Sequence, residues 1–243
     1  MKRFQTLIAF SAFFLSAATF AGPSAKDTTL SRPNAGPAAV PEKSNGVIVR
    51  QQADAAPGTP SRAIQDLEAK MDDYRTGDNL TSEDKAKNAQ IKKEIITGIF
   101  DIRELCRLSL DKHWGQRSAA EQSNFVNLMS QLLEKKAILS KEQSKTQGKK
   151  VMIKYLGDSF LDPQKTRART KTSITIPKEE VNISIEYKLV KNGNEWKIFD
   201  VIVDDASLVD NYKYQFNSII TKHGYPELVS RISKKLNDLD SKS

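Results

Sequence analysis

The amino-acid sequence predicts an α+β protein in which helices come first, an antiparallel sheet follows and helices end the chain. Two changes of hydrophobic period indicate this order. Apolar residues recur at three- and four-residue spacing from Ile64 to Leu139, and then alternate with polar residues from Lys149 to Val203. The helical spacing returns after Ser207. We therefore expect N-terminal helices, a curved sheet of about four strands and C-terminal helices.

The first 21 residues have the features of a secretory signal peptide. Lys2 and Arg3 form a basic start, a mostly apolar run follows, and the small residues Ala18 and Ala21 suit cleavage. The apolar run is shorter than the ~20 residues of a spanning helix. We expect residues 1–21 to be removed on export, with an uncleaved membrane anchor as the alternative.

Residues 22–60 are predicted to form a disordered tether before a single folded domain at 61–243. The tether is rich in Pro, Ala, Ser and Gly and has little apolar periodicity, apart from the short apolar piece Val47–Val49. Cys106 is the only cysteine, so no intramolecular disulfide can form, and no cysteine for lipid attachment follows the cleavage site.

Four helices are predicted before the sheet, and side chains that cap helix starts locate three of them. The first helix has an apolar stripe that includes Ile64 and Leu67. Caps for the next three are Thr81 or Ser82, then Asp101, and then a capping box that runs from Ser118 to Glu121.

The strands are expected at residues 151–155, 167–176, 181–189 and 195–203, where the period is two. Asn192-Gly193 is typical of a two-residue hairpin turn between the last two strands. Short connections of this kind favour an antiparallel meander.

The stretch from Trp196 to Tyr225 supplies the largest apolar surface. Trp196, Ile198 and Ile202 share one parity and Phe199, Val201 and Val203 the other, which predicts a strand that is apolar on both faces. The helix that follows is predicted to start at Ser207 and to end at Gly224, with an apolar stripe that comprises Leu208, Tyr212, Phe216, Ile219 and Ile220.

The formal net charge of +8 falls to +6 when Lys2 and Arg3 are removed, and the basic residues are spread along the chain. Such a surface suits anionic lipid headgroups or acidic partner surfaces. Nucleic acid is the other common partner of a basic protein, but export argues against it. A solvated basic face without a dedicated partner is the plain alternative.

No pattern of catalytic residues is apparent, so we do not expect an enzyme, a metal site or a cofactor. His113 and His223 have no neighbours at metal-ligand spacing, and Cys106 lies on an apolar helix stripe. Asp200, Asp204 and Asp205 form an acidic cluster that an acid/base pair or a calcium site would need. Such residues more often end a strand and start a helix, and an unrecognised enzyme that uses them is the least favoured hypothesis.

The most prominent feature of the sequence is its large number of apolar residues in the predicted helices and strands. Two interpretations of them follow. One is an ordinary core, which a chain of this length needs. The other is a cavity for acyl chains, because removal of each CH₂ from water is worth about 0.8 kcal/mol. Such a ligand needs no charged pocket, since its head can stay in water.

Two sets of residues resemble the Mla-type (toluene-tolerance), MlaC-like family of periplasmic phospholipid-binding proteins. The first runs from Phe100 to Arg107 and continues to Leu110 and Trp114. The second combines many unlike residues at fixed spacing, namely Trp196–Val201, Ser207–Val209, Asn211–Tyr212 and Gln215–Phe216. The sequence departs from the family pattern at Asp111, at Lys136–Ala137 and in the length of the tether.

The resemblance implies a periplasmic carrier that buries the acyl chains of a glycerophospholipid. Its partners would be an inner-membrane MCE-domain protein of an ABC transporter and an outer-membrane lipoprotein complex, and the traffic would maintain outer-membrane lipid asymmetry. By analogy with NTF2-like folds, helices packed across a curved sheet would form a cone with an apolar interior.

On this hypothesis we expect eleven residues to line the lipid cavity: Ile99, Leu132, Val151, Ile153, Ile174, Ile183, Ile185, Val201, Val203, Tyr212 and Phe216. Arg167 and Arg169 are candidates for contact with the headgroup phosphate. The alternatives are an exported NTF2-like interaction domain with a solid core and protein partners, and a carrier of another apolar ligand such as a hopanoid. Co-purified lipid distinguishes a carrier from a solid domain.

Overall fold

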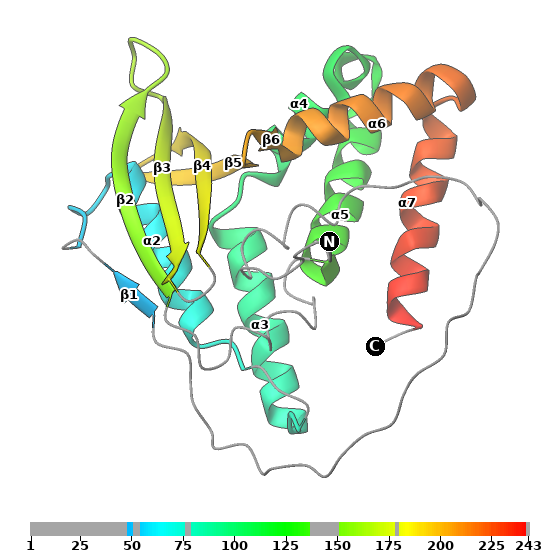
Figure 1. Cartoon of the computed structure of the whole chain (residues 1–243). Helices are drawn as coiled ribbons and strands as arrows, with labels where there is room; N and C mark the ends of the chain where they lie inside the picture. The colour runs from blue at the N-terminus through cyan, green and yellow to red at the C-terminus, as the bar shows by residue number, and fades with distance from the viewer. Residues whose placement is uncertain (1–47, 51–53, 76–78, 137–150, 178–179, 242–243) are drawn as a thin grey trace.

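The computed structural model describes residues 48–50, 54–75, 79–136, 151–177 and 180–241. The sheet stands on one side of the molecule and most of the helices on the other (Figure 1). In chain order the elements are β1 (Ile48–Arg50), α2 (Pro60–Asp72), α3 (Ser82–Gly98), α4 (Ile102–Leu110), the 3-10 helix η1 (Asp111–Gln116), α5 (Ala119–Lys136), β2 (Val151–Phe160), β3 (Arg167–Ile176), β4 (Val181–Asn192), β5 (Glu195–Val203), β6 (Ala206–Ser207), α6 (Leu208–His223) and α7 (Tyr225–Asp240). The predicted α+β class is confirmed.

The sheet has the strand order β1-β2-β3-β4-β5-β6. The four predicted strands are β2 to β5, and they form the expected antiparallel meander. The structure adds β1, which pairs in parallel with β2, and the short β6, which pairs with the end of β5. β1 lies within the residues that were predicted to form the tether. The predicted signal peptide and residues 22–47 of the tether lie outside the described residues.

The predicted helix caps are present. Thr81 and Asp84 form a capping box at α3, and Ser118 and Glu121 exchange the equivalent bonds before α5. At α4 the amide of Glu104 donates to the carboxylate of Asp101 over 2.8 Å. The hairpin has a two-residue turn as predicted, but its residues are Gly193 and Asn194, one position later than the predicted Asn192-Gly193, and Gly193 has a φ of 60°. These short polar signals are local, which is why the sequence locates them to within one position.

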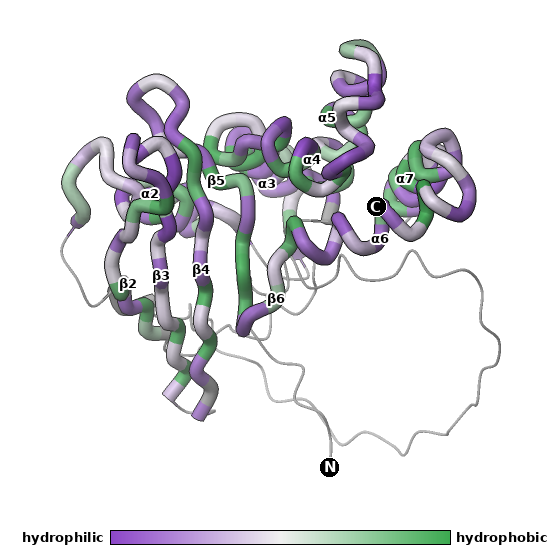
Figure 2. Tube along the Cα trace, turned by 90° about the horizontal axis from the view of Figure 1, so that it is seen from above, coloured by the Kyte–Doolittle hydropathy of each residue, from purple (hydrophilic) through white to green (hydrophobic). Residues whose placement is uncertain are grey.

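The parity predicted for β5 is wrong because of a β-bulge. Leu189 of β4 pairs with Ile198 and Lys188 pairs with Asp200, so Phe199 is the extra residue. The bulge places Val201 on the same face as Ile198, and β5 presents one continuous apolar side to the interior. The tube of β5 is hydrophobic over most of its length (Figure 2).

Three helices make the main contacts with the sheet. α2 packs against β2, β3 and β5, whereas α4 and α6 reach the sheet at β5. α5 and α7 pack against other helices. An edge-to-face contact between Phe125 and Phe216, with ring centroids 5.6 Å apart, joins α5 to α6. Among the described residues no helix is both long enough and apolar enough to cross a membrane.

Candidate functional site

Six of the predicted lining residues lie on the buried face of the sheet. The register aligns Ile153, Ile174 and Ile183 across β2, β3 and β4 in one row. Ile185 of β4 pairs with Val203 of β5 in the adjacent row, and Val201 of β5 pairs with Tyr187 of β4 in the row after that. The structure therefore brings these six together, because the two-residue period of each strand turns them to the same side.

Three further lining candidates belong to the helical layer. Leu132 lies on α5, while Tyr212 and Phe216 lie on α6, with their rings stacked at 5.1 Å. Ile99 lies between the layers, because its carbonyl accepts a bond of 2.9 Å from the amide of Ile198. Val151 begins β2, and its side chain lies outside the described residues.

The ten lining candidates whose side chains are described are at most 9% exposed and belong to one hydrophobic cluster. Burial of this kind fits both the ordinary core and the wall of a cavity. The sequence therefore predicted correctly that these residues lie inside, and their contact with a lipid stays a prediction.

The buried face also carries polar groups that the sequence analysis did not single out. Thr170, Thr172 and Tyr187 are buried in its central rows, and Glu68 of α2 is buried nearby. Burial raises the pKa of the Tyr187 hydroxyl, and the carboxylate of Glu68 raises it further. The alternation of Thr170 and Thr172 with basic residues was the available signal, since it puts the threonines on the buried side.

Asp200 connects the sheet to the start of α6. Its carboxylate accepts bonds from the hydroxyl of Ser207 (2.9 Å), the amide of Val209 (3.0 Å) and the ammonium of Lys188 (3.2 Å). Ser207 in turn accepts from the amide of Asp210 at the first turn of α6. Burial raises the pKa of Asp200, which these bonds and the charge of Lys188 oppose. Asp200 lies within β5 and does not end the strand, but its bonds to Ser207 and Val209 fit the other half of the predicted structural role, the start of a helix.

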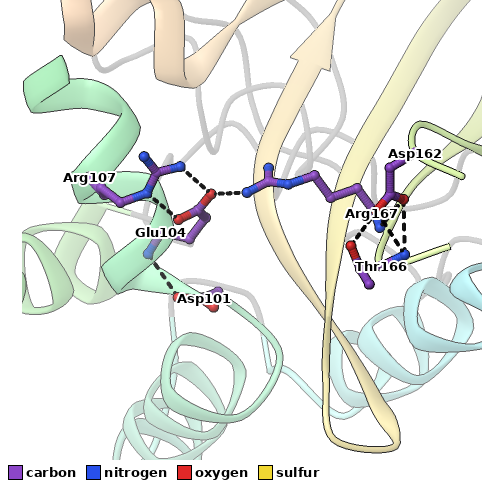
Figure 3. A network of polar contacts seen from close by, with 6 residues as sticks. All are labelled: Asp101, Glu104, Arg107, Asp162, Thr166 and Arg167. Atoms are coloured by element: carbon purple, nitrogen blue, oxygen red, sulfur yellow. Dashed lines mark hydrogen bonds and ion pairs between the residues drawn. The ribbon is translucent and has the colours of Figure 1, made fainter. Parts of the chain in front are cut away.

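A second polar network links α4 to β3 (Figure 3). The carboxylate of Glu104 accepts two bonds from Arg107, at 2.7 and 2.8 Å, and one from Arg167. The pKa of Glu104 is lowered from its usual value. Hydrogen bonds from Arg107 lower this pKa most, and Arg167 lowers it further. The guanidinium of Arg167 also lies 5.0 Å from the ring centre of Phe199.

The two headgroup candidates lie on the other face of the sheet from the lining candidates. Arg167 pairs with Glu104, and Arg169 pairs with Glu186 over 2.9 Å. The alternation along β3 requires this arrangement, because Ala168 between them is buried. A phosphate that bound either guanidinium would compete with a carboxylate already in place.

A surface groove lies between η1 and α6, with a volume of about 560 Å³. The residues that line it include Asp111, Lys112, Lys213, Tyr214 and Lys222. None of the predicted site residues lines this groove.

The remaining candidates for chemistry are Cys106 and side chains that could bind a metal ion. Cys106 is fully buried, and burial raises the pKa of its thiol well above the usual value. Within the described ranges, no group of three or more His, Cys, Asp and Glu side chains is placed to hold a metal ion.

Comparison with known proteins identifies similarities at the level of family and fold. The family model described as MlaC protein matches residues 65–234, which span α2 to α7. A structure of the phospholipid-binding protein from Ralstonia solanacearum, in complex with a phospholipid, superposes with a TM-score of 0.56 at 19% sequence identity. The superposition covers 77% of this chain and 99% of the other. No curated protein matches the chain.

Proposed function

Because this chain belongs to the MlaC family, we propose that it is an exported carrier that binds the acyl chains of a phospholipid inside its apolar interior. We further propose that it works in the periplasm and exchanges lipid between an inner-membrane MCE-domain ABC transporter and an outer-membrane lipoprotein complex. Such traffic would help to keep the outer membrane asymmetric. The protein acts by binding and release, with no covalent chemistry of its own.

The observation that carries this proposal is the extent of the family match. It covers both the sheet and the helical layer, so it includes every proposed lining residue. The fold of the phospholipid-bound Ralstonia protein supports the same conclusion, since nearly all of that chain superposes on this one. The apolar face that runs across β2 to β5 supplies the side chains that an acyl chain needs.

A direct test is to purify the protein without detergent, extract it with organic solvent and measure phosphorus and fatty acids against protein. We expect phospholipid in near-stoichiometric amount, because the gain of about 0.8 kcal/mol for each buried CH₂ retains two acyl chains through purification. Repeated absence of lipid after gentle purification would count decisively against a carrier. A hopanoid or another terpenoid in the extract would keep the carrier but change its ligand.

The lining is tested by a matched pair of valine substitutions on the two faces of the sheet. Val201 is fully buried on the inner face of β5, whereas Val190 of β4 pairs with Arg167 and Lys197 on the outer face. We expect Val201→Trp to abolish lipid binding by filling the space of an acyl chain, while the protein stays folded. Val190→Trp adds the same side chain and should leave lipid binding unchanged.

The second candidate function is a protein-interaction domain with a solid core. The burial of the lining candidates is compatible with it, since an ordinary close-packed interior buries its apolar side chains in the same way. In a solid core, Val201→Trp overpacks the interior and lowers stability by ~1–3 kcal/mol or more. Unfolding of that variant, together with no lipid in the wild type, would establish the solid core.

A further inference from the structure

Exposed apolar side chains gather along β2 and the turn that follows it. Phe160 is 47% exposed and Leu161 is 41% exposed, and Leu156 lies earlier on the same strand. They are three of the four large hydrophobic residues that are exposed in the described part of the chain. The turn between β2 and β3 projects away from α2 and from the helices (Figure 1). We define the hairpin tip as residues 160–166.

The hairpin tip is held in one conformation. The amide of Leu161 donates to the carbonyl of Arg167 over 2.9 Å. The carboxylate of Asp162 accepts bonds from the amides of Thr166 (2.9 Å) and Arg167 (2.8 Å) and from the Thr166 hydroxyl. Asp162 therefore turns its charge toward the backbone of the turn. A tip that is already ordered loses little conformational entropy when its apolar side chains bind.

Positive charge accompanies the apolar side chains. The ammonium of Lys165 lies 5.3 Å from the ring centre of Phe160. Along β3, Arg169 and Lys171 share the single carboxylate of Glu186, at 2.9 and 3.3 Å, so this part of the strand keeps excess positive charge. An aromatic ring beside an ammonium suits the boundary of a bilayer, where the ring enters the acyl region and the charge meets phosphate.

We propose that the hairpin tip docks this protein on anionic membrane surfaces, with Phe160 and Leu161 inserted between headgroups and Lys165 at the level of the phosphates. The size of the tip favours a membrane over a protein partner. A stable protein interface buries about 800 Å² on each side, which two side chains on a turn cannot supply. Shallow insertion combined with charge needs only a few such residues, and gives weak, reversible binding.

The tip also continues into the buried face of the sheet. Phe160 pairs with Ala168 of β3, and its ring centre lies 6.2 Å from that of the buried Trp196. Docking at the tip would thus bring one end of this face to the bilayer. This consequence rests on the proposed lipid carriage, whereas the docking itself does not.

The test is flotation of the mature chain with vesicles of phosphatidylethanolamine, with and without phosphatidylglycerol. We expect binding to the anionic vesicles that falls as salt rises, because salt screens the charge of the tip. The double variant Phe160→Ser/Leu161→Ser should bind about tenfold more weakly, since two half-exposed apolar groups no longer enter the bilayer. Lys165→Glu should weaken binding to the anionic vesicles about fivefold.

Leu156→Ser is the matched control, because Leu156 is as exposed as the tip residues but lies roughly 16 Å along the strand from Leu161. It should bind vesicles like the wild type. Leu161→Ser alone should bind about threefold more weakly, and it leaves the contact between Phe160 and Trp196 intact, so it serves if the double variant is unstable.

Several results would overturn the docking. They are no flotation of the wild type, equal loss for Leu156→Ser, or tip variants that still float. If the wild type does not bind vesicles but its hairpin tip cross-links to a membrane protein, the tip is a contact site for a protein and not for lipid. Co-purified lipid is measured separately, so the carrier can stand where the docking fails.

Discussion

Replacement of Asp200 by alanine should destabilise the protein more than any other single change of a polar side chain among those described above. Asp200 is only 2% exposed and holds three groups at once, from β4, from β6 and from the first turn of α6. The alanine variant removes the acceptor and leaves its donors in place.

The magnitude follows from what each donor loses. The amide of Val209 is left buried without an acceptor, which costs about 1–3 kcal/mol. The loss of one partner from a buried ion pair costs about 3–5 kcal/mol, but the side chain of Lys188 is 28% exposed and regains some hydration. These terms overlap, and we expect a loss of about 3 kcal/mol in the free energy of unfolding. Asp200→Asn keeps the shape and one acceptor oxygen, so it should lose about half as much.

Urea denaturation measures this loss as a fall in the midpoint with an unchanged slope. Asp238→Ala, at an exposed position near the end of α7, is the control and should stay within about 0.5 kcal/mol of wild type. A loss below about 1 kcal/mol in Asp200→Ala would refute the argument that this carboxylate holds the sheet to α6.

The pKa of Asp200 is raised in the folded state, so the native protein binds more protons just above pH 3.8. Its contribution to stability therefore declines as the pH rises through that window, and Asn at this position removes the decline.

Two further predictions concern Glu104 and Cys106. The pKa of Glu104 is lowered in the folded state, so its contribution to stability is present above its usual value near 4.5 and is lost as the pH falls through the folded pKa. Glu104→Gln should therefore cost about 1–2 kcal/mol at neutral pH and flatten the acid side of the stability profile, whereas equal costs at pH 3 and pH 7 would contradict the bridge to Arg107 and Arg167. The Cys106 thiol is buried and its pKa is raised, so a thiol reagent should label it only as fast as the protein unfolds. Labelling at the rate of a free thiol would show that α4 and α6 separate frequently in the native state.

The sequence predicted elements well where the signal is local. The capping box from Ser118 to Glu121 and the two-residue hairpin near Gly193 depend on residues no more than three positions apart, and both are present. The bulge at Phe199 depends on how β4 and β5 meet, and parity within one strand does not encode it. The strand Ile48–Arg50 was missed for the same reason. Its partner in β2 lies about a hundred positions later, and no local sequence pattern indicates the pairing.

The site shows the same division between local and long-range information. Alternation within β3 and β4 was enough to predict that Ile174 and Ile183 are buried together. It was not enough to predict that Arg167 would face α4 and pair with Glu104, because that contact joins residues 63 positions apart. The polar middle of the buried face, with Thr172 and Tyr187 close to Glu68, also requires the packing of α2 on the sheet.

The proposed lining residues belong to two layers, and β5 is where those layers meet. The isoleucines of β2, β3 and β4 lie on the sheet, whereas Phe216 and Leu132 lie among the helices. α2, α4 and α6 all reach the sheet at β5, and the backbone bond from Asp101 to the carbonyl of Ile198 fixes α4 there. A single acyl chain that touches both groups must therefore pass along β5. Val201 lies on that strand, so tryptophan at this position obstructs the path, whereas a bulky residue on β3 would leave the helical half free.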